Sequence, residues 1–137
     1  MRPFLSVSIA LLTSALAGAP WLVQAQAPQA LLDPWQHAAQ VAQAGFAASP
    51  ERGAAFFTAR HGDLACANCH GPDPRGAGRH AVTGKAIEPL APVAQPTRLA
   101  DRARAEKWFR RNCKDVLARE CTAAEKADVV AWLVSLR

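Results

Sequence analysis

The five residues CANCH, Cys66 to His70, carry the clearest chemical signal in the sequence. Two thiols separated by two residues match the spacing of the two vinyl groups of a haem, and the following residue delivers an imidazole to the iron. The pattern therefore predicts one haem c, bound covalently through Cys66 and Cys69, with His70 as an axial ligand.

Two other chemistries use a pair of nearby cysteines. A zinc site needs further thiolates or histidines at ligand spacing, and Cys113 and Cys121 are too far apart to form a second C-x-x-C motif. A thioredoxin-like redox pair needs the strand and helix context of a βαβ fold, which the sequence lacks. The haem interpretation is favoured over both.

The motif does not identify the ligand on the other face of the iron. Methionine is the usual partner of the histidine in electron-transfer cytochromes, but the only methionine is Met1. The remaining candidates are His37, His61, His80, Lys85, Asn112 or no ligand at all. Residue chemistry alone favours His80, because imidazole commonly replaces methionine and a loop ten residues after His70 can pass round the haem edge.

The second pair of cysteines, Cys113 and Cys121, is compatible with a disulfide or with two free thiols. Eight residues of continuous helix would separate the Cα atoms by about 12 Å, which is too far for a disulfide. A bridge becomes possible if the helix ends near Arg119 and the chain then turns back. An oxidising compartment would favour the bridge.

Residues 1–25 have the features of a secretory signal peptide. Arg2 precedes the apolar stretch FLSVSIALLTSALAGA, and VQA, ending at Ala25, provides small residues for cleavage. The apolar stretch is interrupted by Pro20 and is short for a membrane anchor. We therefore expect a periplasmic protein without stable membrane insertion after cleavage.

The net charge of +5 is ordinary for a soluble domain and can steer docking to an acidic partner. No feature of the sequence predicts binding to nucleic acid. Half of the residues are apolar, alanine is abundant and strong strand formers are few, which together favour an all-α fold.

Four helices are predicted from caps and periodicity. Residues 26–48 are expected to form a lead-in and a first helix, which begins with Asp33 as N-cap and Pro34 at the first position and runs toward Ala44. A second helix is expected from Ser49 and Pro50 to about Arg60, inside a haem domain spanning 49–137.

The remaining two helices follow a long loop over 71–97. The third begins at Asp101, and the fourth opens with a capping box formed by Thr122 and Glu125. We expect the helix around Phe56 and Phe57 to pack across the last helix near Trp132 and Leu133.

Two long segments resemble the sphaeroides haem protein family, SHP, a branch of the class I cytochromes c. They are CANCHGPDPRGAGRHAVTGKAIEPLAP and PTRLADRARAEKWFRRNCKDVLARECTAAEKADVVAWL, and the similarity covers roughly residues 49–137. The resemblance implies a small class I cytochrome c-like fold, with helices packed around one covalent haem.

The resemblance also implies the ligand set. In that family the asparagine of the RNC stretch ligates ferric iron, and the following cysteine is bridged to the cysteine of REC. These positions are Asn112, Cys113 and Cys121, while His70 matches the axial histidine. The resemblance therefore moves Asn112 ahead of His80 as the sixth ligand.

A neutral amide suits Fe(III) better than Fe(II), so reduction is expected to release Asn112 and to open a site for O₂, NO or CO. The resemblance implies a dihaem cytochrome c as redox partner and either oxygen binding or nitric oxide chemistry as the activity. Two alternatives stay open: a bis-histidine electron carrier using His70 and His80, and a small peroxidase with His80 as distal base.

Overall fold

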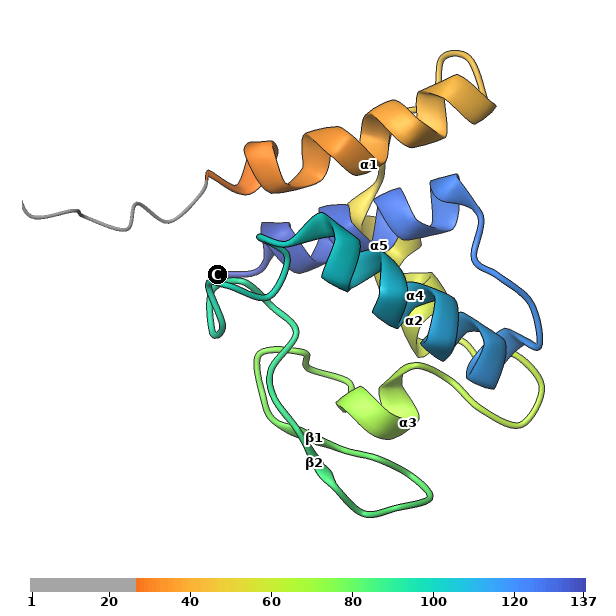
Figure 1. The fold of residues 1–137 in the computed structure, drawn as a ribbon, viewed down its shortest axis with the longest axis vertical. Coiled ribbons are helices and arrows are strands. Elements are labelled where there is room, and N and C mark those ends of the chain that lie inside the picture. Colours follow the sequence, from red (N-terminus) through yellow and green to blue (C-terminus); the bar gives the residue numbers. More distant parts are fainter. Residues whose placement is uncertain (1–26) are drawn as a thin grey trace, which may run out of the picture.

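The computed structural model describes residues 27–137, so the expected signal peptide lies outside the described residues (Figure 1). The chain forms the helices α1 (Pro28–Ala42), α2 (Pro50–Thr58), α3 (Ala67–His70), α4 (Arg102–Leu117) and α5 (Ala123–Ser135). A short antiparallel pair, β1 (Gly78–Arg79) and β2 (Ala86–Ile87), lies between α3 and α4. The prediction of an all-α fold is confirmed, because the two strands contain only two residues each.

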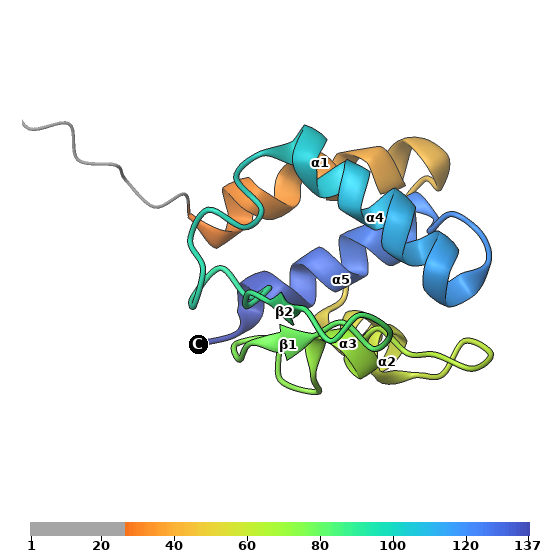
Figure 2. The ribbon, with the colours of Figure 1, turned by 60° about the horizontal axis from the view of Figure 1, so that its bottom comes forward.

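Helix α5 forms the centre of the molecule. Figure 2 shows α1 and α4 on one side of α5, with α2, α3 and the β1–β2 pair on the other. Leu31, Trp35 and Ala39 of α1 are buried in the same core as Val130 and Leu133 of α5. Within 27–137, no helix is both long and apolar enough to cross a membrane.

Helices α2 and α5 cross at very short range, as their residues predict. A Cβ added to Gly53 would overlap the backbone carbonyl of Asp128 and would approach the Cβ of Trp132 to 3.0 Å. The rings of Phe57 and Trp132 lie 4.9 Å apart, and Leu133 is buried beside them. The expected packing of α2 across α5 is confirmed, although Trp132 is half-buried.

The start of α2 is fixed by a buried carboxylate on α5. Asp128 accepts hydrogen bonds from the Ser49 backbone N–H at 2.7 Å and from Arg52 Nε and Nη2 at 2.8 Å each. Ser49 Oγ in turn accepts a hydrogen bond from the Arg52 N–H, which confirms the predicted N-cap. A carboxylate taken out of water needs such partners, so Asp128 ties the first turn of α2 to α5.

The predicted start of the first helix is wrong. Helix α1 begins at Pro28, and Pro34 lies inside it instead of at its first position. Proline in a helix interior removes a hydrogen bond, but Leu31, Leu32 and Trp35 are all buried. Burial of these side chains in the core stabilises a helical turn that precedes the proline, which local cap signals do not reveal.

The caps of the last two helices agree with the predictions. Asp101 accepts a hydrogen bond from the Arg104 N–H, and Thr122 and Glu125 form the capping box of α5. Helix α4 ends at Leu117, where Ala118 adopts a left-handed conformation with φ of 56°, so the condition for a bridge between Cys113 and Cys121 is met.

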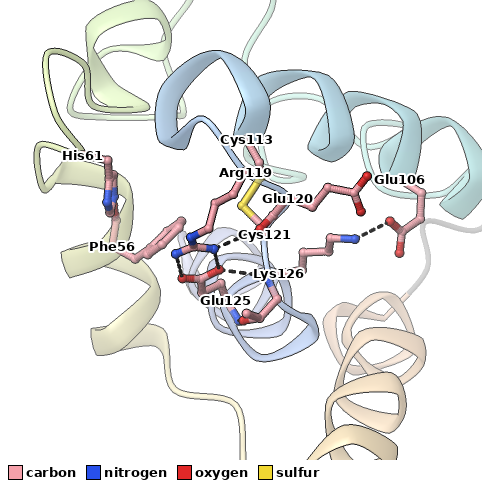
Figure 3. Close-up of a disulfide and its surroundings, with 10 residues drawn as sticks. Phe56, His61, Glu106, Cys113, Arg119, Glu120, Cys121, Glu125 and Lys126 are labelled. Carbon is pink, nitrogen blue, oxygen red and sulfur yellow. Dashed lines mark hydrogen bonds and ion pairs between the residues drawn. A yellow bond between two sulfur atoms is a disulfide. The ribbon is translucent and has the colours of Figure 1, made fainter.

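The turn between α4 and α5 brings Cys113 and Cys121 together in a disulfide (Figure 3). Their Cα atoms lie 5.6 Å apart, within the range that a disulfide requires. Arg119 donates two hydrogen bonds to Glu125, and Lys126 Nζ lies 2.7 Å from Glu106 Oε2. One covalent bond and two ion pairs therefore hold α4, α5 and the turn between them.

We predict that Gly53→Ala destabilises the haem-loaded protein by about 3 kcal/mol, the upper end of the range for inserting a methyl group into a packed core. The measurement is chemical unfolding followed by circular dichroism. Gly76→Ala is the matched control, since its added Cβ would lie 3.6 Å from its nearest neighbour, and it should change stability by less than about 0.5 kcal/mol. Equal effects of the two substitutions would show that the α2–α5 crossing tolerates a side chain.

A second prediction concerns Glu125. Its pKa is lowered by the hydrogen bonds from Arg119, with smaller contributions from the Thr122 backbone N–H and the charge of Arg119. Because its pKa is lower in the folded state, the ionised carboxylate of Glu125 stabilises the fold. This stabilisation is complete above pH 4.5, the ordinary pKa, and is lost as the pH falls through the folded-state pKa. The melting temperatures of the wild type and Glu125→Gln should therefore differ at pH 7 and converge in acid. A difference that does not change with pH would rule out the charged interaction as its source.

The disulfide gives a third prediction. The unreduced, haem-loaded protein should take up no alkylating reagent in denaturant, because Cys113 and Cys121 are bridged and the other two cysteines are expected to be in thioethers. After reduction it should take up two labels, which intact-mass spectrometry counts. Two labels before reduction would contradict the bridge.

Candidate haem site

The three residues of the haem motif lie on and beside α3, a single helical turn. The His70 N–H donates to the Cys66 carbonyl at 3.1 Å, and Gly71, with φ of 74°, ends the turn. Asn68 Oδ1 accepts a hydrogen bond from the Ala65 N–H and holds the chain before the turn. One helical turn therefore brings Cys66, Cys69 and His70 together within the span that a single haem edge requires.

The segment after the motif folds back onto α3. A Cβ on Gly78 would overlap the Cys69 carbonyl oxygen and would approach the Cα of His70 to 2.8 Å, so only glycine fits at this point in β1. The Ala81 N–H lies 3.3 Å from the Cys69 sulfur. The long loop expected after the motif is therefore an ordered cover for one side of α3.

His70 is held against the helix core with one ring nitrogen unsatisfied. Its ring centroid lies 6.0 Å from that of Phe57. Burial lowers the pKa of His70 to about 4, with a smaller contribution from the charge of Arg98, so the ring is neutral at pH 7 and able to ligate a metal. Nδ1 of this ring is buried and has no hydrogen-bond partner among the described residues.

The two motif cysteines are half-buried and are not bridged to each other. Burial raises the pKa of the Cys66 thiol to about 11. Both side chains are thus available for thioether bonds, and neither is consumed by a competing disulfide within the described residues.

Asn112 lies on α4, the helix that precedes α5. It is half-buried and immediately precedes the disulfide-bonded Cys113. Trp108, one turn earlier and on the same helix face, is 45% exposed, although the helical periodicity groups it with buried residues. A flat apolar cofactor bound next to Asn112 would cover this exposed ring.

The other candidate ligands have different surroundings. His80 Nδ1 is within 3.3 Å of the Val82 N–H and 3.2 Å of the Thr83 N–H, so the ring caps the turn that follows β1. His61 Nε2 lies 2.8 Å from the Phe56 carbonyl oxygen, in a tight turn directly before the motif. His37 and Lys85 are exposed.

Three residues near His70 were not predicted as part of the site. Phe57 was expected in the core, and Gly78 and Arg98 were not singled out. Arg98 donates to the carbonyl oxygens of Pro89 and Glu88, which fixes its guanidinium close enough to His70 to affect its pKa. Of these three, Gly78 is the one that the sequence could have indicated, because a glycine shortly after a haem motif allows two backbones to approach closely.

These residues fit a covalently bound haem. Two thiols are available for thioether bonds, the imidazole of His70 is neutral, and the Trp108 ring is uncovered, which is the chemistry that such a group needs. An open pocket of about 550 Å³ is lined by His61 to Leu64 and by Asp115 to Arg119, at and just after the end of α4. The pocket therefore joins the segment before the motif to the helix that carries Asn112.

Comparison with known proteins identifies relatives over most of the chain. Residues 43–133 match the family described as Domain of unknown function (DUF1924). Cytochrome c-type protein SHP from Cereibacter sphaeroides is 42% identical over 130 residues, covering 91% of this chain and 96% of that protein.

Solved structures agree with the sequence comparison. The structure of oxidised SHP, described as an oxygen-binding cytochrome c, has a TM-score of 0.69 and 44% identity, covering 80% of this chain and 96% of that one. A solution structure of cytochrome c'' from Methylophilus methylotrophus, concerned with haem-ligand detachment, has a TM-score of 0.70 and 32% identity, covering 80% and 93%. The chain therefore belongs to the SHP family of c-type cytochromes, and its cofactor is haem c.

Proposed function

We propose that this protein is a periplasmic cytochrome that accepts an electron, releases Asn112 from the iron and then binds O₂, NO or CO in its place. The observation that carries the proposal is the contrast between Asn112 and His80. Asn112 is half-buried on α4, whereas the ring of His80 is bound to the backbone of its own turn.

In this proposal Cys66 and Cys69 hold the haem, and His70 and Asn112 are its axial ligands. The haem supplies a redox-active iron with two axial positions. The chain supplies ligands of unequal strength: a buried neutral imidazole on α3 and a neutral amide on α4. An amide is a poor ligand for the softer Fe(II), so gain of an electron weakens its bond far more than that of the imidazole.

The contacts of α4 indicate how the amide leaves. Phe109 packs edge-on against Trp35 with ring centroids 5.1 Å apart, and the guanidinium of Arg102 lies over the same indole at 5.6 Å. Cys113 fixes the helix one residue beyond Asn112. Because the helix is held on both sides of the ligand, we infer that Asn112 leaves by rotation of its side chain or a small local shift.

The relatives support the two halves of the proposal separately. Oxidised SHP is described as an oxygen-binding cytochrome c, and cytochrome c'' is described in terms of haem-ligand detachment. We extend both properties to this chain, with Asn112 as the ligand that detaches. We also propose the signal peptide over 1–25, the haem domain over 49–137 and a dihaem cytochrome c as the redox partner.

We predict that Asn112→Ala keeps the haem attached but changes the ferric absorption spectrum, because the sixth ligand is lost. The ferrous wild type should be five-coordinate and should bind CO quickly, and the ferrous spectrum of Asn112→Ala should match it. Absorption spectra of the oxidised, reduced and CO-treated states make the measurement.

His80→Ala is the matched control for this experiment. It should leave the ferric spectrum nearly unchanged, because its ring contacts only turn backbone atoms within hydrogen-bonding distance. If His80→Ala changes the ferric spectrum and Asn112→Ala does not, the protein is a bis-histidine electron carrier. In that case the gas-binding proposal fails.

A further inference from the structure

We propose that the outward side of α4 is a docking surface for an acidic partner protein. The surface, called here the basic face, consists of Arg104, Lys107, Arg111 and Lys114. The proposal rests on the electron-accepting half of the proposed function, but it does not depend on which residue ligates the iron or on gas binding.

The spacing of these residues places them on one side of the helix. They follow one another at intervals of three, four and three residues, which returns to the same face at every turn. All four side chains are exposed. The apolar residues Ala105, Phe109 and Cys113 repeat every four residues on a different side, where they are buried or half-buried. The basic face is therefore the side of α4 turned away from the core.

These cations differ from most others in lacking a partner. Within residues 27–137, none of the four has a carboxylate within 4.0 Å. Six other basic residues do have one: Arg52, Arg75, Arg98, Arg110, Arg119 and Lys126. Of the basic face, only Arg111 has a recorded side-chain contact, with its guanidinium 5.8 Å from the Trp108 ring. Among the described residues, Arg60, Arg79, Lys85, Arg102 and Arg137 also have no such carboxylate, but the basic face groups four unpaired cations on one side of one helix.

This arrangement does not help α4 to fold. Like charges three and four residues apart destabilise a helix, and the basic face contains three such neighbouring pairs. No core contact depends on the four charged groups, so folding alone gives no reason for the repulsion. A negatively charged surface outside the molecule would relieve it, and such complementarity accelerates association and fixes the orientation of the partner.

The chemistry of the face favours a protein over a membrane. A helix that lies in a lipid interface needs an apolar side turned outward, whereas the apolar side of α4 is turned into the protein. Trp108 is the only large hydrophobic residue of α4 exposed among the described residues. Carboxylates on a protein surface supply the negative charge that complements the basic face, and binding to them does not require insertion into an apolar layer. Because α4 also carries Asn112, a donor docked here lies beside the helix that holds the proposed ligand.

The test measures binding of the haem-loaded protein to immobilised poly-L-glutamate by surface plasmon resonance over a range of salt concentrations. The variant Arg104→Glu with Lys107→Glu removes half of the basic face. The matched control, Arg79→Glu with Lys85→Glu, makes the same change in net charge on exposed residues of the hairpin around β1 and β2. Circular dichroism and the ferric spectrum check that both variants fold and keep their haem.

The expected result is at least a tenfold loss of affinity for the α4 variant, with a weaker salt dependence, and less than a twofold loss for the control. Equal losses would show that net charge alone drives binding and would overturn the proposal, as would no loss in either variant. Vesicles containing phosphatidylglycerol form the second arm. The face recognises lipid instead if these vesicles bind the wild type as tightly as poly-L-glutamate does and if the α4 variant loses affinity for them to the same extent. Ligand exchange at the iron is not measured, so failure here leaves the Asn112 proposal standing.

Discussion

The close crossing of α2 and α5 at Gly53 is the constraint on which the haem site depends. Because no side chain separates the two backbones there, Phe57 reaches Trp132 on one side and the His70 ring on the other. The Asp128 carboxylate fixes the first turn of α2 at the same crossing. The position of His70, the proposed axial ligand, is thus set by helix packing, and α3 itself contributes only one turn.

The two proposed ligands are attached to the core in different ways. His70 is half-buried, with its ring 6.0 Å from that of Phe57 in α2, and the segment that carries Gly78 packs against its backbone. Asn112 lies on a helix held by an aromatic contact at one point and a disulfide at another, with an open pocket at its end. In the proposed site, a half-buried imidazole on α3 and a fixed but accessible amide on α4 suit a centre in which one ligand stays and the other exchanges.

Local signals were enough to predict the helices whose ends depend on nearby residues. Helix caps form as expected at Ser49, Asp101 and Thr122. Each of these side chains accepts a hydrogen bond from the N–H three residues later, so the cap depends only on nearby residues. The start of α1 could not be predicted in this way, since burial of Leu31 in the core, far along the chain, outweighs the cost of Pro34 inside the helix. The β1–β2 pair was also missed, because its strands have two residues each and no alternating pattern.

The C-x-x-C-H motif was enough to predict the haem, but residue chemistry alone favoured His80 over Asn112, and only the family resemblance reversed that order. The structure adds a physical reason, since hydrogen bonds from the Val82 and Thr83 N–H groups to Nδ1 hold the His80 ring against its own turn. Crystal structures of the ferric and ferrous haem-loaded protein test the central claim most directly. The account predicts continuous density between Asn112 and the iron in the ferric state and a gap in the ferrous state. Density from His80 to the iron, or an Asn112 bond that persists after reduction, would contradict it.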